Sequence, residues 1–207
     1  MRYKHIIWDF DGTLFDTYPS MARAFTESME AAGYPADYQG IYDSMKIAIS
    51  ETVRRFQSAY GFGQEVIEGY RQRRIAIELA QAHPFDGAVE VLRRVCAAGG
   101  DHFICTHRGD SIHELLRRHG LEGYFRDITT SAHGFKRKPD PEAVQYLLDT
   151  YGMDPAETLM IGDRPLDVQS GQNAGTAGCF FDPGGVTYPP AQHQITDLHE
   201  LIDIIGC

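Results

Sequence analysis

Residues 9–14, Asp-Phe-Asp-Gly-Thr-Leu, directly follow a short apolar run that ends at Trp8. An apolar run of this length, closed by a glycine, predicts a buried strand over residues 3–9. Because ligands bind at the carboxyl edge of open α/β sheets, Asp9 and Asp11 are expected at a ligand site. In extended backbone their side chains would point the same way, and two carboxylates about 4 Å apart repel by roughly 4 kcal/mol. The pair must then share a proton or a cation, unless it is only an acidic turn.

The same pattern returns later in the chain. Residues 158–163 form an apolar run that ends in a glycine and Asp163, and Asp167 follows about one helical turn later. Another apolar run, over residues 101–106, ends in the hydroxyl of Thr106. Residues 136–138, Lys-Arg-Lys, precede two prolines and a helical pattern. In a parallel sheet these acidic, hydroxyl and basic groups would gather at one edge.

Strand and helix patterns alternate from about residue 84 onward. The expected strands are 3–9, 101–106, 126–130, 158–162 and 177–181, and the expected helices are 86–98, 110–120, 140–151, 165–174 and about 197–205. The alternation predicts an α/β fold, with a Rossmann-like parallel sheet wrapped by helices and joined by right-handed crossovers. Residues 17–83 lack a convincing strand and repeat apolar side chains at helical spacing, so we expect an inserted domain of about four helices.

Composition narrows the class of protein. The 207 residues are 43% hydrophobic and 23% charged, which is typical of a globular protein with one domain and a small insertion. The net charge of −10 argues against nucleic acid or an acidic membrane as the partner. We expect no membrane span, no signal peptide and no zinc site. The four cysteines include no CxxC pair, which suits a reducing cytoplasm.

Four stretches together carry a family resemblance: DFDGTLFDT, ICTHR, KRKPDPE and IGDRPLDVQSGQNAG. In this order and spacing the chain resembles the haloacid dehalogenase superfamily of phosphohydrolases, and within it phosphoglycolate phosphatases and β-phosphoglucomutase-like members. The resemblance covers the whole chain, most weakly over residues 17–83. It implies a catalytic core of residues 1–16 and 84–207, and a helical cap of residues 17–83 that closes over the site. The alternative for this insertion is a helical subdomain without a catalytic part.

The resemblance implies a role for each acid. Asp9 would be the nucleophile that forms an acyl phosphate, and Asp11 the general acid and then the general base. The cofactor would be Mg²⁺, a hard ion that prefers carboxylates, water and phosphate oxygens. Asp9, Asp163 and the backbone carbonyl of Asp11 would hold it. Asp167 would be a further ligand or a support, or else only a first-turn helix acid.

The basic and hydroxyl residues would bind the phosphoryl group. Lys138 would pair with Asp9 and the phosphoryl oxygens, and it is favoured over Lys136 and Arg137 because it directly precedes Pro139, as in the family's Lys-Pro pair. Thr106 would donate its hydroxyl to the phosphoryl group. Lys138 and Thr106 are therefore candidates both for catalysis and for substrate binding.

Three further residues are candidate substrate ligands. The family often has an asparagine after the residue that corresponds to Thr106, whereas this chain has His107 and Arg108. Either of them could replace the asparagine contact, Arg108 as a two-pronged donor, or both could be part of a solvated helix start. In similar capped enzymes the loop between the first two cap helices selects the substrate, here about residues 38–46. Lys46 would then meet an anion of the substrate, or be a solvated helix lysine.

These residues favour a Mg²⁺-dependent phosphatase that acts on a small phosphate monoester. The acid at Asp11 points to phosphatases and phosphomutases, because dehalogenases of the superfamily lack it. The alternatives are a sugar phosphomutase of the β-phosphoglucomutase type and a non-enzymatic binding protein on the same fold. As partner we expect a small phosphorylated metabolite, with no nucleic acid and no membrane, and a monomer or weak homodimer.

Overall fold

The computed structural model describes residues 1–207 and divides them into two compact units. The first, Met1–Phe15 with Pro84–Cys207, is called the α/β unit below. The second, Asp16–His83, is called the helical unit. The change from one unit to the other thus comes one residue earlier than the sequence indicates, at Phe15.

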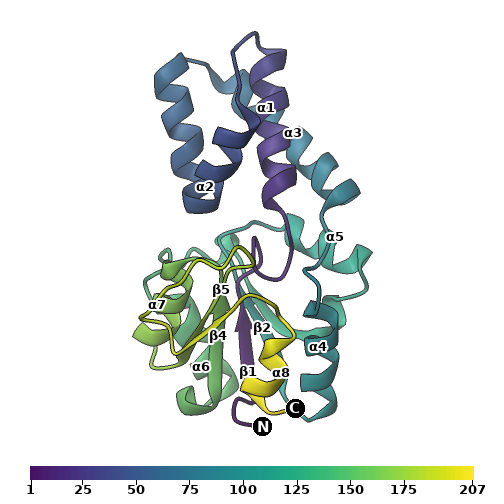
Figure 1. The fold of residues 1–207 in the computed structure, drawn as a ribbon, viewed down its shortest axis with the longest axis vertical. Coiled ribbons are helices and arrows are strands. Elements are labelled where there is room, and N and C mark those ends of the chain that lie inside the picture. Colours follow the sequence, from purple (N-terminus) through teal and green to yellow (C-terminus); the bar gives the residue numbers. More distant parts are fainter. The chain divides into compact units, whose positions relative to one another are not determined.

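The α/β unit is built on a six-stranded parallel sheet with the order β3-β2-β1-β4-β5-β6 (Figure 1). The strands are β1 His5–Trp8, β2 Asp101–Cys105, β3 Phe125–Thr129, β4 Thr158–Gly162, β5 Ala177–Phe181 and β6 His193–Ile195. The predicted α/β fold with a parallel sheet is confirmed. Strand β6 was not predicted from the sequence, because this edge strand is three residues long and buries only Ile195 fully.

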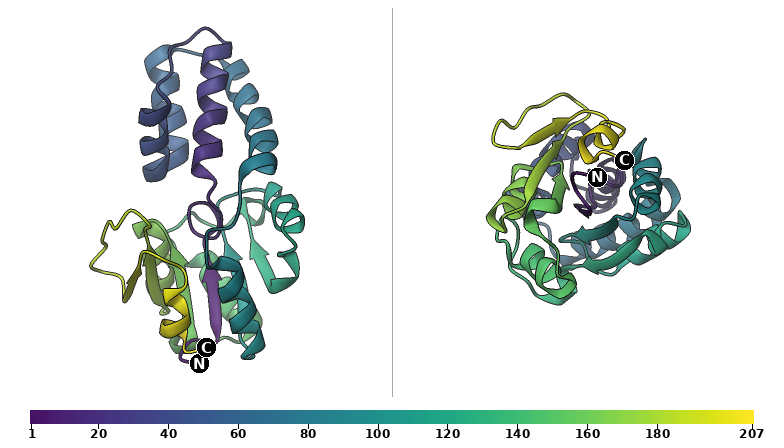
Figure 2. Two further views of the ribbon diagram at one scale, coloured as in Figure 1. Left: turned by 45° about the vertical axis from the view of Figure 1, so that its right-hand side comes forward. Right: turned by 90° about the horizontal axis from the view of Figure 1, so that it is seen from below.

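Helices cover both faces of this sheet (Figure 2). They are α4 Ala88–Ala97, α5 Ser111–Arg118, α6 Glu142–Tyr151, α7 Pro165–Asn173 and α8 Glu200–Ile205. On one face, α6 packs Val144 and Leu147 against Phe103 and Met160 of the sheet. On the other face, the Trp8 indole Nε1 donates to His102 Nδ1, and the second ring nitrogen of His102 lies 3.1 Å from the Leu92 carbonyl oxygen in α4. Alternate side chains of β2 thus enter two separate layers of the core.

The helical unit contains α1 Tyr18–Ala31, α2 Tyr38–Tyr60 and α3 Gln64–Gln81. Its core is aromatic, since the Phe25 ring meets those of Phe56, Phe62 and Tyr70 edge to face. Helix α2 is broken at Ala48, whose backbone is extended at φ −160° and ψ 103°. Three helices, one of them broken, therefore stand where the sequence predicted about four.

The start of α2 corrects one boundary. Asp37 caps this helix by accepting from the backbone N–H groups of Gln39 and Gly40. The loop between the first two helices is therefore 32–37, and residues 38–46, which the sequence analysis took as that loop, begin α2.

Two further expectations concern the whole chain. None of its helices combines the length and the apolar character that a membrane span requires. All four cysteines are free thiols, and Cys105 and Cys179 are buried in strands as small apolar groups.

Candidate phosphoryl-transfer site

The strand order brings the predicted polar residues to one edge of the sheet. Strand β1 lies in the middle, and Trp8 at its end pairs with Ile104 of β2 and Ile161 of β4. Asp9, which follows β1, therefore lies near the ends of both neighbouring strands. The chain leaves β1 to build one half of the sheet and returns to build the other, and such a switch point forms a crevice at the carboxyl edge.

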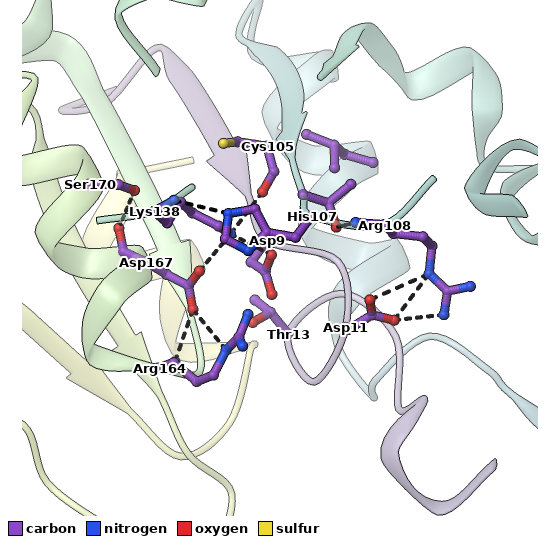
Figure 3. Close-up of polar contacts among 12 residues, drawn as sticks. Asp9, Asp11, Thr13, Cys105, His107, Arg108, Lys138, Arg164, Asp167 and Ser170 are labelled. Atoms are coloured by element: carbon purple, nitrogen blue, oxygen red, sulfur yellow. Dashed lines mark hydrogen bonds and ion pairs between the residues drawn. The ribbon is translucent and has the colours of Figure 1, made fainter. Parts of the chain in front are cut away.

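Lys138 is the centre of a buried group of charges (Figure 3). Its ammonium Nζ donates to Asp9 Oδ1 at 2.6 Å and to the Cys105 carbonyl oxygen at 3.0 Å. It also forms an ion pair with Asp167, whose Oδ1 lies 2.5 Å away. The Lys138 ammonium thus connects the end of β1, strand β2 and the first turn of α7.

Burial and charge shift the pKa values in this group. Burial raises the pKa of the Asp9 carboxyl to about 6, although the ammonium of Lys138 opposes the shift. Burial by itself would lower the pKa of Lys138, but the carboxylates of Asp167 and Asp9 outweigh it and hold that pKa above its ordinary value. Lys138 is therefore charged at neutral pH.

The close approach of Asp167 to the strand requires Gly162. A Cβ atom at Gly162 would lie 2.1 Å from the Cβ of Asp167, far inside van der Waals contact. Asp167 Oδ2 accepts from the backbone N–H of Arg164 at the start of α7, which has Pro165 in its first turn. Asp167 is thus a first-turn helix acid, and it is also fully buried beside Lys138.

Three carboxylates in this site fit a hard cation. Asp9, Asp163 and Asp167 each offer one oxygen, and these oxygens lie within 4.8 Å of one another. Asp9 Oδ2 is buried and has no hydrogen-bond partner, an arrangement that costs free energy unless something binds it. Asp163 is oriented by the Thr13 hydroxyl, which donates to its Oδ1 at 3.2 Å. The residues present therefore suit Mg²⁺, whose preferred ligands are a few carboxylates.

The carboxylate of Asp11 is not part of that group. Phe10 lies in a turn, so the extended backbone that would align Asp9 with Asp11 ends before Asp11, and Gly12 continues the bend at φ +83°. Asp11 instead pairs with Arg108, whose Nη2 lies 2.7 Å from Asp11 Oδ1. Figure 3 shows this pair on the opposite side of Asp9 from Lys138 and Asp167. The expected sharing of one cation by the two carboxylates is not what the structure shows, because Asp9 pairs with Lys138 and Asp11 with Arg108.

Thr106 and His107 follow β2 and are held by the backbone around them. The Thr106 hydroxyl oxygen accepts from the backbone N–H of Arg108 at 3.1 Å, and a hydroxyl in this role can still donate its hydrogen. His107 Nε2 accepts from the backbone N–H of Lys138 at 2.9 Å. Burial, followed by the charges of Lys138 and Arg137, lowers the pKa of His107 to about 3, so the ring is neutral. His107 thus contacts the Lys138 loop, a role that nothing in the sequence indicated.

The other candidate ligands lie outside the buried group of charges, although Lys136 and Arg137 line a cavity beside it. Lys136 and Arg137 are exposed, and Lys136 pairs with Asp140 at 3.6 Å. Lys46 is half-buried near the start of α2 in the helical unit. A cavity of about 240 Å³ lies beside the charged group in the α/β unit. Its wall includes Thr106, His107, Lys138 and the hydroxyl residues 129–131.

Comparison with known proteins places these features in one family. A family model described as haloacid dehalogenase-like hydrolase matches residues 6–180. N-acetylmuramic acid 6-phosphate phosphatase from Pseudomonas aeruginosa is 31% identical, with 99% of this chain and 96% of that protein covered. A phosphoglycolate phosphatase from Vibrio parahaemolyticus is 29% identical, with 98% and 96% covered.

Solved structures agree on the fold. A hydrolase from Streptococcus pneumoniae superposes with a TM-score of 0.71 at 31% identity, and both chains are fully covered. The HAD-hydrolase YfnB from Bacillus subtilis, solved bound to magnesium, has a TM-score of 0.78 at 25% identity over the full length of both chains.

Proposed function

The chain belongs to the haloacid dehalogenase-like hydrolase family, and we propose that it is a Mg²⁺-dependent phosphatase that forms an aspartyl-phosphate on Asp9. The observation that supports this proposal most is the buried group of Asp9, Lys138 and Asp167 with Asp163 beside it. Such a concentration of charge out of water is costly, and in an enzyme it serves to neutralise a charged substrate. The α/β unit would be the catalytic core and the helical unit a cap.

In the first step a carboxylate oxygen of Asp9 attacks phosphorus. The bond from phosphorus to the ester oxygen breaks, and its electron pair stays on that oxygen, which takes a proton from Asp11 as it leaves. Lys138 and the Thr106 hydroxyl donate to the phosphoryl oxygens and offset their charge. These groups are already in place, so little reorganisation is needed during the reaction.

In the second step water attacks the phosphorus of the aspartyl-phosphate. Asp11, now ionised, takes a proton from that water, and the bond from phosphorus to Asp9 breaks. Inorganic phosphate leaves and the Asp9 carboxylate is restored. Each residue thus returns to its starting state after one turnover.

The cation would be held by Asp9, Asp163 and the backbone carbonyl of Asp11, with Asp167 as a further ligand or as the partner of Lys138. When bound, Mg²⁺ would neutralise phosphoryl charge and orient the phosphate. The three carboxylate oxygens that lie close together support this assignment.

The substrate would be a small phosphorylated metabolite. Among the relatives, one is named for N-acetylmuramic acid 6-phosphate and another for phosphoglycolate, two phosphomonoesters that also carry a carboxylate. Carboxylated phosphate esters are therefore the first compounds to try. The absence of nucleic acid and membrane as partners, a monomer or weak homodimer, and a cytoplasmic location stay predictions of the sequence.

Two alternatives differ in what happens to the phosphoryl group. A phosphomutase keeps it on Asp9 until the product accepts it, so steady phosphate release excludes that activity as the main one. A non-enzymatic protein on this fold would release no phosphate at all.

The test is a phosphate-release screen over small phosphorylated metabolites with Mg²⁺, then in excess EDTA. We expect release that depends on Mg²⁺, with Ca²⁺ a poor substitute because it prefers more ligands and longer bonds. Undiminished release in EDTA, with no metal found by elemental analysis, would contradict the metal site. A readout that needs no turnover accompanies it: calorimetry should show Mg²⁺ binding to the wild type, and weaker binding to Asp163→Asn.

A further inference from the structure

Arg108 donates hydrogen bonds to the carboxylate of Asp11 from two of its guanidinium nitrogens. Its Nη2 donates to Asp11 Oδ1 at 2.7 Å, and its Nε lies 3.2 Å from Oδ1 and 3.4 Å from Oδ2. The side chain of Arg108 is 1% exposed and that of Asp11 10% exposed. A buried bidentate ion pair fixes the plane of the carboxylate as well as its position, which a single hydrogen bond would not do.

Arg108 is itself held from three directions. Its Nη1 donates to the Ser111 hydroxyl at the start of α5, 3.1 Å away. Its guanidinium carbon lies 5.2 Å from the centre of the Phe10 ring, a cation–π contact. Its backbone N–H donates to the Thr106 hydroxyl oxygen. Arg108 thus contacts both the loop that follows β1 and the Thr106 hydroxyl just after β2.

We propose that Arg108 is a positioning residue for Asp11, and that it is not a ligand of the phosphoryl group. All three guanidinium nitrogens donate within the protein, two to Asp11 and one to Ser111. In Figure 3 the guanidinium and Asp11 lie together, away from Lys138, which carries the phosphoryl-binding charge. The inference rests on the proposed function, because it assigns Arg108 a task in that reaction.

The physical consequence is a loss of alignment. Without the guanidinium, the Asp11 side chain can rotate, and proton transfer requires the carboxyl to lie within hydrogen-bond reach of the leaving oxygen or the water. A small displacement of such a group slows the reaction while substrate binding is kept. The expected result is a fall in kcat with little change in KM.

The first experiment measures how fast Arg108→Ala and Arg108→Lys hydrolyse p-nitrophenyl phosphate and one alkyl phosphate in the presence of Mg²⁺. We expect kcat to fall about 100-fold in Arg108→Ala with KM within about threefold, and by less in Arg108→Lys, which keeps one donor. Free guanidinium should restore part of the activity of Arg108→Ala. Arg117→Ala is the control, an exposed arginine in the last turn of α5, and it should leave both constants unchanged.

The second experiment separates positioning from phosphate binding. Calorimetry measures the affinity for inorganic phosphate in the presence of Mg²⁺, which needs no turnover. The affinity of Arg108→Ala should stay within about threefold of the wild type. A loss of tenfold or more would make Arg108 a phosphate ligand and overturn the proposal.

The third experiment is a double-mutant cycle with Asp11→Asn, measured by single turnover of p-nitrophenyl phosphate. If Arg108 acts through Asp11, Arg108→Ala should cost less than about threefold once the carboxylate is gone. Losses that multiply would overturn the proposal. Wild-type protein that releases no phosphate would overturn the proposed function and this inference together, whereas normal wild-type turnover with multiplying losses would remove only the role of Arg108. Thermal unfolding of each variant shows whether the fold is kept.

Discussion

The two units of this chain bury different kinds of side chain. The α/β unit takes charges out of water, in the pairs of Lys138 with Asp9 and Asp167 and of Arg108 with Asp11. The helical unit buries a cluster of aromatic rings around Phe25. It also partly buries an ion pair between Arg74 and Glu78, two residues on successive turns of α3. Taking a charge out of water costs free energy even when the charge is paired, so the α/β unit carries a cost that the helical unit largely avoids. Under the proposed function, that cost marks where the reaction occurs.

We expect substitutions in the two units to have different effects on phosphate-ester hydrolysis. Changes at the buried charges should slow the hydrolysis of every phosphate ester, because all esters share the phosphoryl group. Changes in the helical unit should alter the ranking of substrates, because they affect the part that differs among esters.

The largest effect should come from Asp9→Asn, which removes the nucleophile and one metal ligand together. We expect turnover to fall by the equivalent of at least about 3–4 kcal/mol for every ester, while circular dichroism shows a folded protein. Asp149→Asn, at an exposed acid on α6, is the control and should be fully active. Turnover of Asp9→Asn within tenfold of the wild type would remove Asp9 as the nucleophile.

A second effect concerns stability and is confined to the α/β unit. Burial lowers the pKa of His102 from 6.5 to about 4, so as the pH falls below 6.5 the unfolded chain takes up this proton before the folded one does. The free energy of unfolding should therefore drop between pH 6.5 and 4, by about 3 kcal/mol from this residue. Urea unfolding of His102→Gln should show a flatter pH dependence over this range. The control His113→Gln, at an exposed ring, should keep the wild-type slope.

A third effect tests the close packing at the end of β4. Gly162→Ala places a methyl group where the Asp167 side chain lies, so Asp167 must move away from Lys138. We expect a loss of about 1–3 kcal/mol in the free energy of unfolding and a fall in kcat for all esters. Gly123→Ala, which meets no atom within 4 Å, is the matched control. A fully active and stable Gly162→Ala would show that the position of Asp167 is unimportant.

The smallest effect is expected in the helical unit, at Tyr42 and Lys46. If Lys46 meets a second anion of the substrate, Lys46→Ala should lower kcat/KM for an acidic ester by roughly 1–3 kcal/mol and leave p-nitrophenyl phosphate nearly unchanged. Tyr42→Phe is measured in the same way. Equal losses on both substrates would show that these residues act on stability or closure, and the division between the units would fail.

The sequence predicted the parallel sheet because β1, β2, β4 and β5 are largely apolar runs that alternate with helical patterns, whereas β3 contains Arg126 and Asp127. It missed β6 because only one of its side chains is fully buried. The break in α2 could not be foreseen, since alanine at position 48 favours helix and no glycine or proline stands beside it.

The candidate site was predictable where a residue ends a strand. Asp9, Thr106 and Asp163 could be placed at one edge from periodicity alone. The partner of Asp11 could not, because Arg108 is 97 positions away and only the pairing of β1 with β2 brings them together. The contact of His107 with the Lys138 backbone depends in the same way on a loop whose path the sequence does not show.

The most direct test of the account is to trap the covalent intermediate on Asp9. Wild-type protein is mixed with a ³²P-labelled substrate and Mg²⁺, quenched in acid within a turnover, and the peptide that carries the label is identified by mass spectrometry. We expect one labelled peptide, containing Asp9, whose label is released by hydroxylamine as expected of an acyl phosphate and is absent in Asp9→Asn. A label on another residue, or fast phosphate release with no labelled protein at any quench time, would contradict it.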